Sequence, residues 1–247
     1  MIRSQIAKGF RRKHPPLSPK FPTITVGFTT INREETEGGN YIDESWGSLV
    51  KGGIFTSRLV KRIILSVGEP EGDYTKYIRD LTRLEPIVSA KKLNVIEHTH
   101  KVYEEFKKSP TDYFLLCQDD VKVTSSFFPK IERFLSRFSI TADVFSLYTP
   151  YRQVDQCTTG LWEYDTKDFY SYVCVLMKKD VVLDYLKSPY GKPTDKIKGA
   201  DMLFKNFCLK YNKKIIAHAP NIATHIGVKS SLGHNKHYDA EYKVMNG

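Results

Sequence analysis

Hydrophobic residues along this chain fall into short runs that alternate with stretches in which they recur every three or four positions. The short runs predict strands, which we place in the first half at 23–28, 63–67, 87–90 and 113–117. The spaced stretches between them predict helices that begin near Ile42, Tyr74 and Val95. This alternation predicts an α/β fold in which a mostly parallel, mixed sheet is flanked by helices.

The pattern changes in the second half of the chain. Residues Phe127 to Phe138 carry one apolar helical stripe, which predicts a core helix, and shorter helices are expected at 181–186 and from Asp201 onward. Further strands are expected at 143–148, 169–177 and 214–219. The second of these is rich in aromatic and β-branched residues, which predicts a long antiparallel strand at the edge of the sheet.

Two adjacent carboxylates, Asp119 and Asp120, end the strand predicted at 113–117. Open α/β sheets bind ligands at the carboxyl ends of their strands, where a turn can direct both side chains into one crevice. A hard divalent cation together with a diphosphate would balance their charge. In the alternative interpretation, the pair caps the next helix near Ser125 and Ser126 and only stabilises the helix dipole.

A second polar motif lies near the other end of the chain. After the strand at 214–219, His225 is followed by Gly227 and by the hydroxyls of Ser230 and Ser231. Imidazole can hold a metal, and serine hydroxyls can donate to phosphate oxygens. A lone histidine is more often structural, so this motif gains meaning only together with the acidic pair.

The two motifs together resemble the metal and donor-phosphate site of GT-A glycosyltransferases. The first strand adds to the resemblance, because it ends in Thr-x-x-Arg-Glu at Thr30, Arg33 and Glu34. This looks like the opening motif of the N-acetylglucosaminyltransferase IV family, glycosyltransferase family 54. The three motifs occur in the family's order between residues 23 and 233. Relatives of GT-A fold in bacteriophages glycosylate hydroxymethylated pyrimidines in DNA, and the chain is compatible with that group.

The resemblance implies a metal-dependent, inverting transfer of a sugar, with a UDP-sugar as the expected nucleotide-sugar donor. Asp120 would be the direct ligand of Mn²⁺ or Mg²⁺, and His225 would be a second ligand or a phosphate contact. The remaining donor-binding residues would be Thr29, Thr30, Arg33, Asp119, Ser230 and Ser231. Gln118 departs from the usual Asp-x-Asp, which removes the first acidic position.

The resemblance also assigns the general base. Many GT-A enzymes place an acid at the start of a helix after the long aromatic strand, and Asp201 occupies that place here. The alternative is that Asp201 is only a helix N-cap. The aromatic residues Trp162, Tyr164 and Tyr170 are expected to form a wall against which an acceptor stacks, whereas Phe169 is expected in the core.

Length and composition fit a single domain, because 247 residues with 40% apolar content can form a complete core. We expect a basic, proline-rich arm at 1–22, a GT-A domain at 23–233 and a tail at 234–247. No apolar run is long enough to span a membrane, and no signal peptide is evident. The four cysteines lack metal-site spacing and are expected to be reduced, which predicts a cytoplasmic protein, or one of the host cytoplasm if a phage encodes it.

The net charge of +10 is concentrated in two blocks. Residues 1–20 carry six basic residues and no acid, and 187–214 carries eight lysines against two aspartates. Blocks of this kind attract polyanions. We therefore hypothesise that the acceptor is DNA with a hydroxymethylated pyrimidine, contacted by Arg11, Arg12, Lys13, Lys196 and Lys198.

Other functions remain open from the sequence. One is transfer to a protein-linked or cell-surface glycan, including assembly of surface glycan at an anionic membrane face. A second is nucleic-acid binding without catalysis, in which the acids and His225 are structural. A third is a metal nuclease, although that function gives no account of Thr30 and Arg33.

Overall fold

The computed structural model describes residues 21–34, 40–138, 142–149, 160–169, 172–192 and 199–227. Several predicted functional residues lie outside the described residues: Arg11, Arg12, Lys13, Tyr170, Lys196, Lys198, Ser230 and Ser231. The tail predicted at 234–247 and nearly all of the arm predicted at 1–22 also lie outside them.

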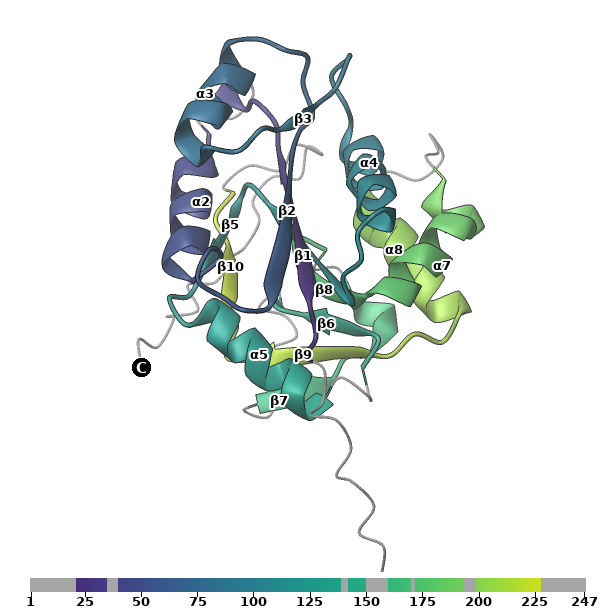
Figure 1. The fold of residues 1–247 in the computed structure, drawn as a ribbon. Coiled ribbons are helices and arrows are strands. Elements are labelled where there is room, and N and C mark those ends of the chain that lie inside the picture. Colours follow the sequence, from purple (N-terminus) through teal and green to yellow (C-terminus); the bar gives the residue numbers. More distant parts are fainter. Residues whose placement is uncertain are drawn as a thin grey trace, which may run out of the picture.

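An eight-stranded sheet runs through the middle of the molecule in the order β3-β2-β1-β4-β8-β6-β9-β7 (Figure 1). Its strands are β1 (Ile24–Thr30), β2 (Val60–Val67), β3 (Ile87–Val88), β4 (Tyr113–Gln118), β6 (Val144–Ser146), β7 (Gly160–Glu163), β8 (Cys174–Lys178) and β9 (Ile215–Ala219). The strands from β3 to β4 are all parallel. Beyond them, β8 is antiparallel to both neighbours, β9 is parallel to β6, and β7 is antiparallel to β9. The predicted mostly parallel, mixed sheet is confirmed.

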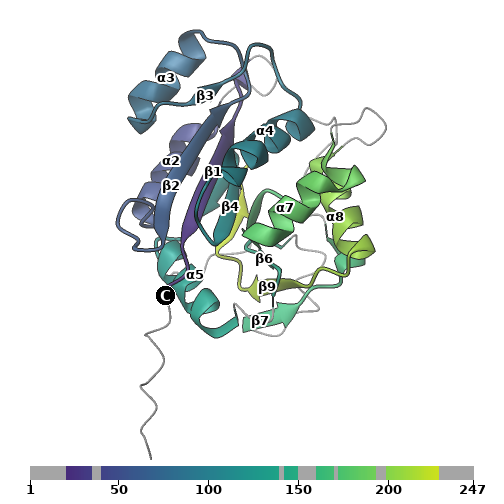
Figure 2. The ribbon, with the colours of Figure 1, turned by 45° about the vertical axis from the view of Figure 1, so that its right-hand side comes forward.

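Helices cover both faces of this sheet (Figure 2). They are α2 (Ile42–Lys51), α3 (Asp73–Thr82), α4 (Val95–Lys107), α5 (Phe127–Phe138), α7 (Lys179–Lys187) and α8 (Ala200–Lys210), with the 3-10 helices η1 (Thr166–Asp168) and η2 (Pro189–Gly191). One core lies between the sheet and α2, α3 and α5, and the other between the sheet and α4, α7 and α8.

Strand β4 contributes to both cores, as its uninterrupted apolar sequence predicts. Leu115 and Cys117 belong to the core beneath α2 and α5, whereas Phe114 and Leu116 belong to the core beneath α4. Successive side chains of a strand point to opposite faces, so a strand covered on both sides must be apolar at every position. The strand therefore holds its polar end at a fixed place between two packed layers.

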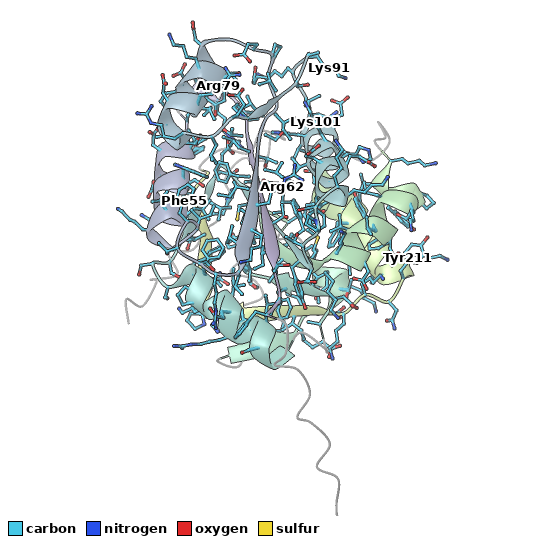
Figure 3. All side chains as sticks on the ribbon, in the orientation of Figure 1. Phe55, Arg62, Arg79, Lys91, Lys101 and Tyr211 are labelled. Atoms are coloured by element: carbon cyan, nitrogen blue, oxygen red, sulfur yellow. The ribbon has the colours of Figure 1, made fainter. Side chains whose placement is uncertain are left out.

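Helix α4 lies directly against the backbone of β1. At Gly27 a Cβ atom would lie 2.2 Å from the ring of Phe114 and 2.7 Å from a methyl carbon of Val102, so only glycine leaves room for these side chains. Polar contacts also fasten the helix to the sheet. Arg62, labelled in Figure 3, forms an ion pair with Glu105, and the amine of Lys101 donates to the carbonyl of Val88 over 2.7 Å.

The strand predicted at 169–177 is a correction. Strand β8 begins only at Cys174, and it lies inside the sheet between β4 and β6; its antiparallel direction was predicted correctly. The aromatic residues before it have another role, because Phe169 and Tyr172 are buried against Phe204 of α8. The described edge strands of this sheet are β3 and β7, and β7 was not predicted from the sequence.

A small second sheet was also not predicted. It pairs β5 (Val121–Val123) with β10 (Ala223–His225) in antiparallel fashion, and His225 lies opposite Val121. This pairing brings two segments that are about a hundred residues apart in sequence to the end of β4, which the candidate site requires.

The described cysteines, Cys117, Cys174 and Cys208, are free and buried, which confirms their predicted place in the core; Cys157 lies outside the described residues. None of the helices in the described part of the chain is both long and apolar enough to cross a membrane. The described chain begins at Phe21, whose ring lies 3.8 Å from the guanidinium carbon of Arg58 beside the start of β1.

Helix α4 also carries a buried histidine. The Nε2 atom of His98 lies 3.1 Å from the carbonyl oxygen and 3.0 Å from the hydroxyl of Ser66 on β2. Burial lowers the pKa of His98 to about 4, against an ordinary value of 6.5, because the charged imidazole would lose its hydration. The folded chain therefore keeps this side chain neutral.

The pKa of His98 predicts how stability depends on pH. Between pH 6.5 and 4 the unfolded chain takes up a proton at His98 that the folded chain does not. The contribution of His98 to the free energy of unfolding is therefore complete above about pH 6.5 and is lost as the pH falls. At pH 5 the loss should be about 2 kcal/mol. Urea unfolding of the wild type and His98→Gln at pH 5 and 7.5 measures it, because glutamine can still bond Ser66 but does not titrate. An equally steep pH dependence in both proteins would contradict the assignment.

Candidate functional site

The acidic pair forms the turn between β4 and β5. Gln118 ends β4 and Val121 begins β5, so Asp119 and Asp120 lie at the carboxyl end of a central strand, as predicted. They do not cap the next helix, because α5 begins only at Phe127 and their carboxylates contact other elements. The capping interpretation is therefore wrong.

Asp119 is bound by the end of β1. Its Oδ1 atom accepts a hydrogen bond from Arg33 Nη2 at 2.7 Å, and its Oδ2 atom accepts from the Thr30 hydroxyl at 2.9 Å and from the Ile31 N–H at 3.1 Å. The Thr30 hydroxyl also contacts the hydroxyl of Tyr74 on α3. The Thr-x-x-Arg motif of the first strand thus meets the acidic motif directly.

Asp120 is bound by His225 and Arg33. Its Oδ2 atom lies 3.1 Å from His225 Nε2 and 3.4 Å from Arg33 Nη2. Its Oδ1 atom is buried and accepts no hydrogen bond from another residue in the described part of the chain. The backbone N–H of Ile226 donates to the Asp120 carbonyl over 2.7 Å, which fixes the histidine loop beside the acid. The site therefore contains a buried carboxylate oxygen that can take a further positive partner.

Arg33 connects the two acids and is itself held in place. Its backbone N–H donates to Asn40 Oδ1 over 2.8 Å, and its guanidinium lies 6.0 Å from the centre of the Tyr41 ring. In the structure the Arg33 Nη2 atom contacts both carboxylates, and the predicted pairing of Arg33 with a diphosphate stays a prediction.

Burial raises the pKa of both carboxylates, and the neighbouring charges decide whether each pKa ends above or below its ordinary value. Burial raises the pKa of Asp119, the like charge of Asp120 adds to the rise, and Arg33 opposes it. For Asp120, burial again acts upward, but the hydrogen bond from His225 and the charge of Arg33 bring its pKa below the ordinary value. The pKa shifts therefore favour an ionised Asp120, next to the Arg33 guanidinium that contacts both acids.

A pocket of about 240 Å³ opens beside these residues. Its walls are the end of β1, the first turns of α4 and the acidic turn, and it is lined by Thr29, Thr30, Ile31, Arg33, Leu93, Asn94, Val95, His98, Thr99, Gln118, Asp119 and Asp120. The predicted residues Thr29, Thr30, Arg33, Asp119 and Asp120 therefore share one cavity, and His225 contacts it through Asp120.

The α4 wall of the pocket and Tyr74 were not predicted from the sequence. Asn94 and Glu97 form a reciprocal capping box at the start of α4, and this N-terminal signature is visible in the sequence. It marks where the helix begins, but it does not show that the helix faces the acidic turn.

Asp201 lies on a separate element. It is the second residue of α8, after Gly199 at the N-cap, so the alternative that Asp201 itself is the N-cap is wrong. Gly199 has a φ of 129°, and a Cβ atom there would lie 2.5 Å from Asp201 Oδ1. Glycine therefore allows the carboxylate to lie against the chain that enters the helix.

Two of the three aromatic residues predicted as an acceptor wall, Trp162 and Tyr164, lie in β7 and directly after it. Trp162 and Tyr164 are stacked with ring centres 5.0 Å apart. Tyr164 is buried, and its hydroxyl donates to the carbonyl of Asp168 over 3.2 Å, so its ring belongs to the core beneath α8. Trp162 is half-buried on the edge strand.

Part of the second basic block is neutralised. Lys213 forms an ion pair with Asp184 at 2.9 Å, and Lys214 forms one with Glu163 at 2.7 Å. The net charge of residues 187–214 therefore overstates what this surface can offer to a polyanion.

No protein-family model matches this chain. No curated protein matches it either. Among solved structures, the crystal structure of TarS from S. aureus, a glycosyltransferase, is similar with a TM-score of 0.57 and 12% sequence identity. The similarity covers 81% of this chain and 36% of the TarS chain. At this identity the similarity concerns the fold: the chain has the predicted GT-A fold, a single α/β domain. The resemblance to the N-acetylglucosaminyltransferase IV family stays a prediction.

Proposed function

We propose that this protein is a metal-dependent glycosyltransferase that transfers a sugar from a nucleotide-sugar donor, expected to be a UDP-sugar, to a hydroxyl acceptor. One observation carries the proposal. The buried group of Arg33, Asp119, Asp120 and His225 stands at the carboxyl ends of β1 and β4, beside a pocket, in a GT-A fold. Ligands of open α/β sheets bind at this edge.

The residues present fit a divalent cation whose coordination the donor completes. The described ranges contain no group of three or more histidine, cysteine or acidic residues that could hold a metal ion without a substrate. Mg²⁺ and Mn²⁺ are commonly held by one or two protein side chains together with substrate phosphates. Asp120, through its unpaired buried Oδ1 atom, and His225 would supply the protein ligands. When bound, the cation would neutralise charge that develops on the leaving diphosphate.

The other residues of the group would bind and orient the donor. Asp119 is held by Arg33 and Thr30, so its carboxylate is fixed in a position to accept hydrogen bonds from ribose or sugar hydroxyls. Arg33 lines the pocket and can contact the diphosphate as well as the acids. Ser230 and Ser231 remain proposed phosphate contacts.

Asp201 would act as the general base of an inverting transfer. Its place in the first turn of α8 puts the carboxylate near the positive end of the helix dipole, which favours the ionised form that can accept a proton. It would take the proton from the acceptor hydroxyl as that oxygen attacks the anomeric carbon.

For the acceptor, we propose DNA that carries a hydroxymethylated pyrimidine. The support is the six basic residues in 1–20, a segment whose sequence has no acid, and the lysines of 187–214 other than the buried Lys205 and the ion-paired Lys213 and Lys214. Because Tyr164 is buried, stacking on an exposed base would fall to Trp162. A glycan is the alternative acceptor.

The metal assignment predicts the effect of Asp120→Asn. The substitution keeps the shape of the side chain but removes the charged ligand, so Mn²⁺-dependent binding of UDP should weaken by at least about 100-fold. Loss of a residue that only supports a metal ligand weakens metal binding by up to about 100-fold, and loss of the ligand itself should cost at least as much. Titration calorimetry with UDP, with and without Mn²⁺, measures it. Asp112→Asn, at the other end of β4, is the matched control and should bind like the wild type. Unchanged Mn²⁺-dependent binding in Asp120→Asn would refute the assignment.

The base assignment predicts a different result for Asp201→Asn. Transfer should fall by roughly 10²–10⁴-fold, as is typical when a general base is removed, while donor affinity stays the same. Single-turnover transfer and UDP binding give the two quantities. Asp180 is the second residue of α7, as Asp201 is of α8, so Asp180→Asn controls for loss of an acid in a first helical turn. Normal transfer by Asp201→Asn would show that its role is structural.

The acceptor proposal predicts salt-sensitive binding of DNA. The logarithm of affinity should fall with the logarithm of salt with a slope of about −0.9 per phosphate contacted, and charge reversal of Arg11, Arg12 and Lys13 should make the slope shallower. Reversal of three exposed lysines elsewhere, Lys76, Lys91 and Lys107, is the charge-matched control. Transfer to oligosaccharides but not to hydroxymethylpyrimidine DNA would reject this acceptor in favour of a glycan.

A further inference from the structure

Helix α2 places two buried serines against the turn that carries the acidic pair. The Ser45 hydroxyl donates to the Val121 carbonyl over 2.5 Å and lies 3.4 Å from the Gln118 carbonyl. The Ser48 hydroxyl accepts from the Val123 N–H over 2.9 Å and donates to the Ser45 carbonyl over 2.8 Å. These contacts reach the backbone on both sides of Asp119 and Asp120.

Helix formation alone gives no reason for serine at these positions. Ser45 has no exposed surface and Ser48 is 7% exposed, although alanine would favour the helix and bury no hydroxyl. A serine inside a helix commonly bonds a carbonyl of its own preceding turn, as Ser48 does. Ser45 instead crosses to another element. The Ser45 hydroxyl therefore bonds the β4–β5 connection and not a carbonyl of its own helix.

The geometry shows what these bonds hold. Gln118 and Val121 are the residues that flank the acidic pair, so a single hydroxyl spans the two ends of the turn. On the other side, the Ile226 N–H bonds the Asp120 carbonyl beside His225. The turn is therefore fastened from α2 and from the β10 segment, and the carboxylates project from a backbone with little freedom to move.

We propose that Ser45, supported by Ser48, is a positioning residue for the cation and donor-diphosphate site, and this inference rests on the proposed function. Neither serine reaches the acids through its side chain. Each acts through the backbone that sets where Asp120 and His225 can meet a shared ligand. Sites of this kind need placement within roughly 0.5 Å, which the surrounding hydrogen bonds must supply.

The test measures cation binding without turnover. The electron paramagnetic resonance signal of free Mn²⁺ in the presence of UDP, compared with the same solution without protein because UDP itself binds Mn²⁺, gives the dissociation constant of protein-bound Mn²⁺. Ser45→Ala should raise this constant by about tenfold or more, the usual range for residues that support a metal ligand, and Ser48→Ala should raise it in the same direction. Urea unfolding of each variant reports stability in parallel.

Ser109→Ala is the matched control. Ser109 is also buried, and its hydroxyl bonds that of Thr25 at 2.6 Å near the opposite ends of the β1–β4 strand pair. Its loss should lower stability but leave the Mn²⁺ constant unchanged. If Ser45→Ala does not fold, Ser48→Ala decides the question.

The possible outcomes separate two failures. If the wild type binds Mn²⁺ with UDP and the serine variants of α2 bind it equally well, Ser45 and Ser48 only stabilise the fold and the inference is overturned. If the wild type itself retains no Mn²⁺ with UDP, the metal-dependent function is wrong, and the inference falls with it.

Discussion

Two carboxylates buried side by side, with one guanidinium between them, are the constraint on which the site depends. Burial of a charge is costly unless it is paired and hydrogen-bonded, and here Arg33 faces both acids while Thr30 and the Ile31 N–H complete the surroundings of Asp119. Asp120 keeps a buried oxygen without such a partner. The fold therefore maintains a buried carboxylate oxygen without a hydrogen-bond partner, and the proposed cation would supply one.

The rest of the fold keeps these charges together. The parallel strands β1 and β4 are neighbours in full register from Ile24 opposite Tyr113 to Thr29 opposite Gln118, so the ends of the two strands must meet. The small sheet brings His225 to the same place from a segment far along the chain. Packing of β4 on both faces then prevents the acidic turn from sliding relative to β1.

The sequence predicted those features that leave a local or periodic pattern. The buried strand before Asp119, the helices near Ile42 and Val95, and the carboxyl-end position of the acids all follow from apolar spacing. Strands as short as β5 and β10 carry no such pattern, because three residues are too few to show a period. The strand predicted at 169–177 began too early because aromatic residues are also typical of strands. Phe169 and Tyr172 are aromatic because they fill a core from an irregular segment. The serines of α2 gave no signal, since a serine in a helix has the same sequence appearance whether it faces water or a neighbouring turn.

The length of β1 separates the candidate site from the point where the predicted basic arm joins the described chain. The strand begins beside Phe21 and Arg58, where the basic arm joins the described chain, and it ends at Thr30 in the site. At about 3.3 Å per residue, its two ends are roughly 20 Å apart. Base pairs stack at about 3.4 Å each, so if the acceptor is the proposed DNA duplex and touches both ends of β1, it would have to extend over about six base pairs. Under that proposal, a shorter acceptor would reach the root of the arm or the proposed reacting centre, but not both at once.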